Sequence, residues 1–355
     1  MNIPDAKGDR LPPTLVDVAR LSNVSRSTAS RVLSGSPRVS SVTRAAVLQA
    51  AEELGYRPNR SARALRTDRS RLIGLVLTNL VNASFQTMTE VLQRRLADED
   101  YQMLLCLTGG STEMEATYVS MLIEHQVDGL IMMGSSGVVS APEALRNSTI
   151  PVVNLIRREL PVTADSVLAA DEEGAHQATA HLTQLGHRRI GLIVGTPDHP
   201  AGNDRRAGYL RALGEADIPI DPALIADGPY SPEFGARIIR RLLDLDDPPT
   251  ALFLANHEAS LGALPILAER GILIPSKLSV VCFEDAPFFR YSRPPLTFVD
   301  HDPHGLADLA VNVLLNRLRG STEAAPRQYR LGAKLIERDS CGPPPKDRGA
   351  TVGSW

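Results

Sequence analysis

The stretch that decides the fold of this 355-residue chain lies close to its start. It reads TLVDVARLSNVSRSTASRVL over residues 14–33 and GYRPNRSARAL over residues 55–65. Thr14 stands three residues before Asp17, so its hydroxyl can cap a helix whose positive end the carboxylate stabilises. We therefore expect a helix that begins near Leu15.

Two more short helices follow the first. Ser25 is placed to cap the second helix, and Ser40 precedes a third that ends where Gly55 can adopt the left-handed conformation. Apolar residues recur at helical spacing on one face of each segment. They are Leu15, Val18, Ala19, Ala29, Val32, Leu33, Val47, Ala51 and Leu54. Three short helices around one small core, with a polar turn between the first two, form a helix-turn-helix pattern that is typical of DNA-binding proteins.

The charge distribution supports this interpretation. Residues 14–71 hold eleven arginines, no lysine and four acidic residues, a net charge of +7, whereas the whole chain has a net charge of −3. An arginine-rich stretch alone fits a solvated face equally well. Here the basic residues lie on a helix-turn-helix pattern, which favours nucleic-acid binding.

The chain resembles the lac repressor/galactose repressor (LacI/GalR) family from about residue 14 to residue 340. Beyond the helix-turn-helix, matching segments follow in the family's order: LIGLVL (72–77), VDGLI (127–131), IPVV (150–153), LGHRRI (185–190), RRAGY (205–209), PTALF (249–253), GAL (262–264) and PLT (295–297). The resemblance implies a DNA-binding transcriptional repressor rather than an enzyme, with no cofactor.

The rest of the chain alternates short apolar runs with amphipathic stretches, which predicts an α/β fold of parallel βαβ units in two doubly wound halves. The resemblance implies a periplasmic-binding-protein-like effector domain whose halves are joined by three crossing strands near residues 169, 299 and 330. The expected order is a disordered tail (1–13), the helix-turn-helix domain (14–57), a hinge helix and linker (58–70), the effector domain (71–341) and a second disordered tail (342–355). Its N-subdomain should span about 71–168 and 300–329, and its C-subdomain about 170–298 and 330–341.

Several other classes of protein are excluded by the sequence. It has no apolar run of about 18 residues and no secretory segment, so we expect a cytoplasmic protein associated with the bacterial nucleoid. Cys106, Cys282 and Cys341 are scattered, which argues against a disulfide framework. No phosphate loop, nucleophile elbow or metal-ligand spacing occurs. A sugar-binding protein of an importer would share the effector fold, but it would need a signal peptide and would lack the helix-turn-helix.

The family's recognition helix, carried over residue by residue, places Arg26, Ser27 and Arg31 at base-contacting positions. It places Thr14, Ser25, Thr28 and Ser30 nearer to phosphates. Because arginine can bind guanine O6 and N7 together, we expect a palindromic operator with G·C pairs in each half, bound by a homodimer. Contact with phosphate alone is the alternative for each arginine.

The segment after the third helix predicts a hinge. Pro58 suits the first turn of a helix. The resemblance implies that this helix enters the minor groove of double-stranded DNA, with Leu65 wedged into the central base step. The implied contact residues are Asn59, Arg60, Ala62, Arg63 and Leu65. A leucine exposed by chance on a linker is the alternative.

An effector site is expected in the cleft between the halves, because ligands bind at the carboxyl ends of parallel strands. The resemblance places there Asn82, Ser84, Phe85, Asp171, Arg205, Tyr230, Asn256, His257, Glu284 and His301. The chain departs from the family pattern at four positions: Ala170, His257 and Glu284 stand where Asp is usual, and His301 stands where Gln is usual. We therefore expect a cleft with less negative charge than that of a plain sugar binder.

Two interpretations of the effector stay open. Arg205 could anchor an acidic sugar derivative, such as a sugar acid or a sugar phosphate, while Phe85 or Tyr230 stacks on its apolar face. A neutral sugar, with the histidines as neutral hydrogen-bond partners, fits equally well, and Arg205 would then be free to form a structural ion pair. The sequence does not decide whether the effector releases DNA or promotes its binding.

Overall fold

The computed structural model describes residues 13–33, 36, 38–56, 69–133, 143–156, 164–196, 200–320 and 325–346. The chain divides into two compact units, Met1–Ser70 and Arg71–Trp355. The predicted hinge contacts, Asn59 to Leu65, lie outside the described residues.

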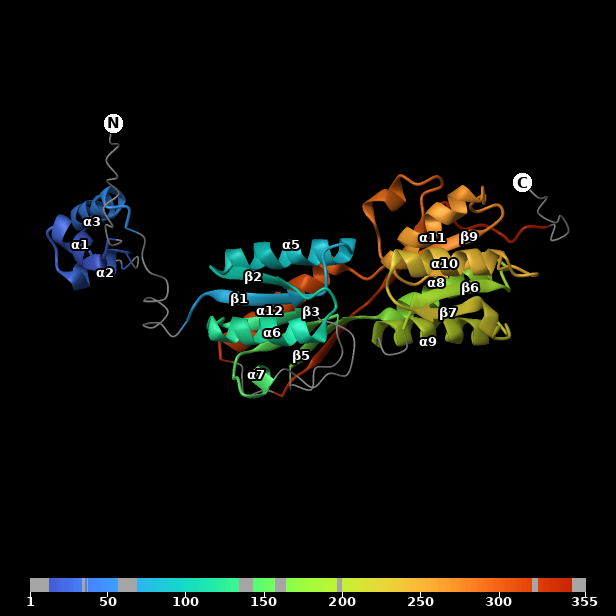
Figure 1. Cartoon of the computed structure of the whole chain (residues 1–355), viewed down its shortest axis with the longest axis horizontal. Helices are drawn as coiled ribbons and strands as arrows, with labels where there is room; N and C mark the ends of the chain where they lie inside the picture. Colours follow the sequence, from blue (N-terminus) through green and yellow to red (C-terminus); the bar gives the residue numbers. More distant parts are fainter. Residues whose placement is uncertain are drawn as a thin grey trace, which may run out of the picture. The chain divides into compact units, whose positions relative to one another are not determined.

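The first unit is a three-helix domain made of α1 (Leu15–Leu21), α2 (Arg26–Leu33) and α3 (Ser41–Glu53) (Figure 1). Thr14 and Asp17 form the predicted capping box, and Ser40 caps α3. Gly55 follows α3 with φ at +64°, which only glycine adopts without strain. The three expected helices are thereby confirmed. Their core consists of Val18, Ala19, Ala29, Val32, Val47, Ala50 and Ala51.

The second unit contains two parallel-dominated sheets, each covered by helices (Figure 1). The first sheet has the order β11 (Gln328–Leu331), β5 (Asp165–Ala169), β4 (Val152–Leu155), β3 (Gly129–Met133), β1 (Leu72–Leu77) and β2 (Gln102–Leu107), and all its pairs are parallel. Its buried strands are apolar on both faces, as a sheet covered by helices requires. One face packs on α5 (Ala83–Asp98) and α12 (Pro303–Leu318), and the other on α6 (Thr112–Glu124) and α7 (Glu143–Arg146).

The second sheet has the order β12 (Lys334–Ile336), β10 (Thr297–Asp300), β9 (Ser279–Phe283), β8 (Ala251–Leu254), β6 (Ile190–Gly195) and β7 (Ile225–Gly228). β12 runs antiparallel to β10, and the other pairs are parallel. One face packs on α8 (Asp171–Gln184) and α9 (Pro200–Glu215), and the other on α10 (Pro232–Leu243) and α11 (His257–Glu269). Two short 3₁₀ turns complete this half, Pro222–Leu224 and Pro287–Arg290.

The chain crosses between the halves three times. It leaves the first sheet after Ala169, returns after Asp300 and crosses again between Leu331 and Lys334. The last strand of the first sheet therefore ends at Leu331, two residues beyond the expected boundary at 329. Pairing with β5 along its whole length holds this strand in the first sheet.

The C-terminal tail begins later than expected. Gly342 donates its N–H to the hydroxyl of Ser279 at 3.0 Å, and its carbonyl lies 2.9 Å from Nε2 of the buried His187. The prediction of a disordered tail from residue 342 thus does not hold at Gly342, because buried polar side chains of the second half bind its backbone.

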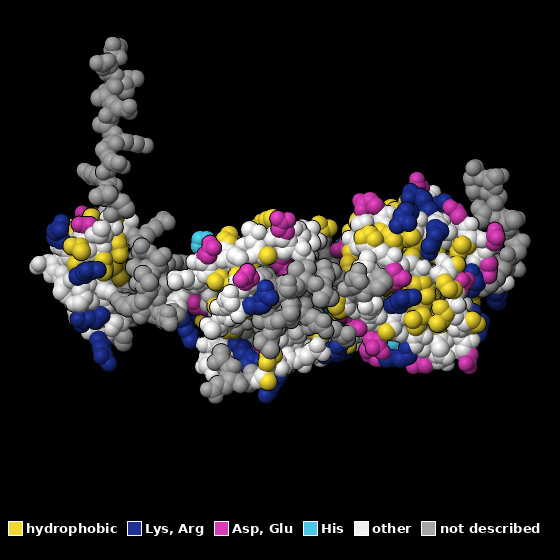
Figure 2. All heavy atoms as spheres, turned by 60° about the horizontal axis from the view of Figure 1, so that its bottom comes forward, with side chains coloured by type: hydrophobic (Ala, Val, Ile, Leu, Met, Phe, Trp, Pro, Cys, Tyr) yellow, Lys and Arg dark blue, Asp and Glu magenta, His cyan; other side chains and the backbone are white. Residues whose placement is uncertain are grey.

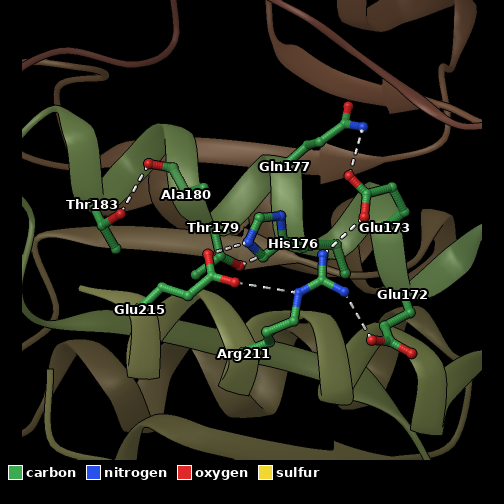
Figure 3. Close-up of polar contacts among 10 residues, drawn as sticks. Glu172, Glu173, His176, Gln177, Thr179, Ala180, Thr183, Arg211 and Glu215 are labelled. Atoms are coloured by element: carbon green, nitrogen blue, oxygen red, sulfur yellow. Dashed lines mark hydrogen bonds and ion pairs between the residues drawn. The ribbon is translucent and has the colours of Figure 1, made fainter. Parts of the chain in front are cut away.

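A charged network ties α8 to α9 at the surface (Figure 3). Arg211 lies 3.0 Å from a Glu172 oxygen and 2.8 Å from a Glu173 oxygen. Glu215 joins Arg211 to His176, whose Nε2 it meets at 2.6 Å. The side chain of Arg211 is 39% exposed, so water screens these contacts.

None of the described helices is long and apolar enough to cross a membrane.

Candidate functional site

The outer face of α2 carries the predicted DNA-contacting residues. Arg26, Ser27 and Arg31 are exposed, whereas Ala29 and Val32 are buried in the helical core. Figure 2 shows that arginine side chains make up most of the charged surface on the visible face of this unit. An exposed helix face of this kind, with its apolar side held by two other helices, suits insertion into the major groove.

Two of the hydroxyl residues predicted near phosphates, Thr14 and Ser25, cap the amino ends of α1 and α2. Ser25 caps α2 by accepting the N–H of Thr28 at 3.1 Å, and its hydroxyl lies 2.8 Å from that of Ser27. Thr14 donates its hydroxyl to Asp17 at 2.7 Å. Ser30 is half-buried on α2. The helix amino ends that these side chains cap are positively polarised, so anions bind well there.

The second unit encloses a cavity of about 320 Å³ at the carboxyl ends of strands from both sheets. Eight of the ten residues expected around the cleft line it: Asn82, Phe85, Asp171, Arg205, Tyr230, Asn256, Glu284 and His301. Parallel strands end at the same edge of a sheet, and here the edges of the two sheets contribute to one cavity.

Two expected residues do not line the cavity. Ser84 is buried in the first turn of α5, where its N–H donates to the side chain of Asn82 at 2.8 Å. His257 begins α11, is 3% exposed and packs its ring against Phe288. Both side chains are buried within the first turn of a helix and are absent from the cavity lining.

Sequence reasoning missed eight lining residues: Thr78, Asn79, Gly109, Gly110, Ile156, Ala169, Ala201 and Glu258. Six of them follow or end β1, β2, β4 or β5, so the carboxyl ends of the predicted strands were a usable signal. Glu258 stands two residues after Asn256, beyond the end of β8.

Arg205 forms the centre of the polar wall. It is 7% exposed, donates Nε to Asp171 at 2.8 Å and Nη1 to the Ala255 carbonyl at 2.7 Å, and lies 3.4 Å from Glu284 through Nη2. Its guanidinium also covers the ring of Phe283, with 3.7 Å to the centroid. Burial alone would lower the pKa of Arg205, but Asp171 and Glu284 raise it above its ordinary value. The guanidinium therefore stays charged, and two carboxylates share that charge.

Glu284 connects the two halves of the unit. Its carboxylate accepts a hydrogen bond of 2.8 Å from the amide of Asn82, which caps α5 in the first half. Burial works to raise the pKa of Glu284, but Arg205, His301 and Asn82 outweigh it and hold the pKa below its ordinary value. Glu284 is thus ionised at neutral pH.

The expected shortage of negative charge is not found among the described lining residues. Glu258 adds a third carboxyl to those of Asp171 and Glu284, against the single guanidinium of Arg205. Burial, reinforced by the neighbouring Glu284, raises the pKa of Glu258 to about 7. An anionic ligand would meet these carboxyls and an arginine already bound to two of them, so the geometry disfavours the acidic effector.

Two residues of the cavity wall have a strained backbone. Ile156 has φ at +54° and Glu284 has φ at +73°, both in the left-handed region, and both line the cavity. Each is held there by a backbone hydrogen bond, Ile156 to Val167 and Glu284 to Val299. Such positions cost about 1–3 kcal/mol and tend to occur at ligand sites.

Two aromatic side chains give the cavity an apolar component. Phe85 comes from α5, and Tyr230 comes from the loop between β7 and α10. Gly195 makes room for Tyr230, because a Cβ at that position would overlap the phenol ring. No cluster of three or more His, Cys, Asp or Glu side chains that could hold a metal occurs in the described part of the chain.

Two family descriptions match the chain. Residues 14–59 match the bacterial regulatory proteins of the lacI family, and residues 179–341 match a periplasmic binding protein-like domain. The chain is 32% identical over 328 residues to the HTH-type transcriptional repressor PurR of Vibrio atlanticus (strain LGP32), which covers 92% of this chain and 98% of that protein. The PurR of Haemophilus influenzae (strain PittEE) is 31% identical over 332 residues, with the same coverage.

Solved structures give the same result. A lac repressor dimer bound to operator and the anti-inducer ONPF has a TM-score of 0.81 and 28% identity, over 94% of this chain and 100% of that chain. A complex of the transcriptional regulator CelR with cellobiose has a TM-score of 0.69 and 29% identity, over 92% of this chain and 99% of that chain. The chain therefore belongs to the lacI family of bacterial regulatory proteins, as a DNA-binding transcriptional regulator with a separate effector-binding domain.

Proposed function

We propose that this protein is a dimeric repressor that reads a palindromic operator with α2 and is controlled by a small polyhydroxylated effector, sugar-like in size and shape. The observation that carries the proposal is the cavity, because both halves of the effector domain line it. Asn82 and Phe85 come from the first half, and Arg205, Tyr230 and Glu284 come from the second. A ligand that touches both halves can bias their relative arrangement, which is how a cleft controls a regulator.

In this proposal Arg26, Ser27 and Arg31 contact base edges. Their exposure on α2 supports the assignment, since the side chains are available to a major groove. Thr14, Ser25, Thr28 and Ser30 lie nearer to phosphates. The hinge contacts by Asn59, Arg60, Ala62, Arg63 and Leu65 remain a prediction.

The effector we propose is uncharged or cationic rather than acidic. Arg205 is bound by two carboxylates, so it serves to orient them as acceptors for ligand hydroxyls. Asn82 and Asn256 add amide groups at the cavity edge, and Phe85 and Tyr230 supply faces for the apolar side of a sugar ring. A cavity of about 320 Å³ lies at the small end of the range for ligand sites.

The operator and the effector can be tested in one experiment. Bound DNA is selected from a random library, with and without neutral and charged monosaccharides. We expect a palindromic motif with G·C pairs in each half and a change in DNA affinity with at least one sugar. A motif without symmetry would contradict dimeric recognition, and affinity unchanged by every sugar would contradict a sugar-like effector.

A pair of variants tests the cavity. Phe85 and Tyr118 are both partly buried aromatic residues on helices of the first half, and only Phe85 lines the cavity. Phe85→Ala should abolish the response to the sugar, whereas Tyr118→Ala should keep it. Loss in both variants, or in neither, would place the effector elsewhere.

We also propose that the protein works at the bacterial nucleoid, where its operator is. A fluorescent fusion should overlap with stained DNA, and Arg26→Ala with Arg31→Ala should weaken that overlap. A fusion spread evenly through the cell would contradict this.

A further inference from the structure

Glu258 differs from the other carboxyls of the cavity in its partners. Asp171 and Glu284 each bind Arg205, at 2.8 and 3.4 Å. Glu258, in the first turn of α11, forms no ion pair with any described residue, although Arg205 and the amide of Asn82 lie near enough to favour its charged form. Glu258 is therefore the carboxyl of this wall whose charge is left for a ligand to balance.

The groups that face Glu258 come from several elements. Asn82 caps α5, Arg205 belongs to α9, His257 is its neighbour on α11, and Glu284 follows β9. The lining holds three carboxyls and one guanidinium, so ionised Glu258 leaves the described wall with an excess of negative charge. Burial beside Glu284 raises the pKa of Glu258 to about 7, which means that a proton or another cation is favoured there.

A second polar group of the wall also lacks a partner. His301 lines the cavity and is only 4% exposed, and its Nδ1 has no hydrogen-bond partner in the described structure. The Nδ1 atom itself is closed off from the cavity, so His301 contributes to the wall through its other ring atoms.

We propose that the effector is a small polyhydroxylated molecule with a protonated amine, of the amino-sugar class, and that its ammonium group pairs with Glu258. This inference rests on the proposed function and specifies its ligand. An ammonium group is a compact charge with three donors, which suits a carboxylate without a cationic partner. The hydroxyls then meet Asp171, Glu284 and the asparagine amides.

The test uses the full-length protein and matched probes. Binding is measured by calorimetry at pH 7.5 for D-glucose, D-galactose and D-mannose, for their 2-amino-2-deoxy counterparts, and for their 6-phosphates. We expect at least one amino sugar to bind tenfold or more tightly than its neutral parent, and the phosphates to bind more weakly than the parent. Glu258→Gln should reduce the preference for the amine to less than about twofold.

Glu90→Gln is the control, because Glu90 is an exposed glutamate of α5 away from the cavity. It should keep the full preference. Tighter or equal binding of a neutral sugar would overturn the amine while leaving the proposed function intact. Binding of no probe would overturn both. An amine preference that survives Glu258→Gln would overturn the role of Glu258.

Discussion

The two units of this protein use arginine in opposite ways. On α2, Arg26 and Arg31 are exposed on a helix only eight residues long. In the cavity, Arg205 is 7% exposed, bound by Asp171 and Glu284, and stacked on a phenylalanine ring. The first arrangement presents positive charge at the surface, and the second neutralises it within the protein.

The difference shows that residue type alone does not reveal what a cation binds. An arginine in a predicted ligand site suggests an anionic ligand, but a buried guanidinium must first be paired by the protein itself. In this cavity, Arg205 holds the carboxylates of Asp171 and Glu284 in place as hydrogen-bond acceptors for a ligand. Variants at the buried and the exposed arginines should therefore differ in what they disturb.

Arg205→Ala should lower the free energy of unfolding by about 3–5 kcal/mol, because it leaves Asp171 and Glu284 buried without their cation. Urea denaturation followed by circular dichroism measures the loss. Arg206→Ala is the control, since the Arg206 side chain is 40% exposed and lies 3.9 Å from Asp227. It should cost less than about 1 kcal/mol. Similar losses in the two variants would mean that the buried ion pairs of Arg205 contribute no more to the free energy of unfolding than the exposed contact of Arg206.

Arg31→Ala should behave in the opposite way, with little effect on unfolding and a large effect on DNA. We expect a loss of about 1–3 kcal/mol on the selected operator and much less on scrambled DNA. Fluorescence anisotropy at fixed salt concentration measures both affinities. Equal losses on the two DNAs would assign Arg31 to phosphate contact and remove it from base recognition.

Glu258→Gln should make stability less dependent on pH. The pKa of Glu258 is raised in the folded protein from 4.5 to about 7, so the folded state holds the extra proton between those values. The free energy of unfolding of the wild type therefore falls as pH rises through that window. Glutamine carries no charge, so the variant should be more stable than the wild type at pH 8 by about 1–3 kcal/mol and similar to it at pH 4.5. Thermal melts at the two pH values measure this, and an equal difference at both would refute the raised pKa.

The helical unit was predictable in detail because its signals are local. Thr14, Ser25, Ser40 and Gly55 each fix a helix end through contacts within a few residues, and the structure places the ends where the sequence predicts them. The alternating pattern of the second unit also predicted two parallel sheets, since strand and helix periods are visible in any short window.

The cavity was predictable only in part. Asn82 and Arg205 followed from a family pattern, whereas Glu258 enters the wall beyond β8, which pairs with β6 about sixty residues earlier in the chain. Sequence spacing contains no information on which sheet edges face each other. The ordered segment at Gly342 escaped prediction for the same reason, because its partners, His187 and Ser279, lie more than sixty residues away.

The smallest effect is expected at Arg211, which lies on the same helix as Arg205 and also binds carboxylates of α8. Its partners are Glu172, Glu173 and Glu215 (Figure 3), and its side chain is 39% exposed. Removing it leaves three carboxylates in water rather than in the interior, so Arg211→Ala should cost less than about 1 kcal/mol and even less at high salt. The same urea titration at 0.05 and 0.5 M sodium chloride measures this. A loss as large as that of Arg205→Ala would show that the number of partners, and not burial, sets the energy of these arginines.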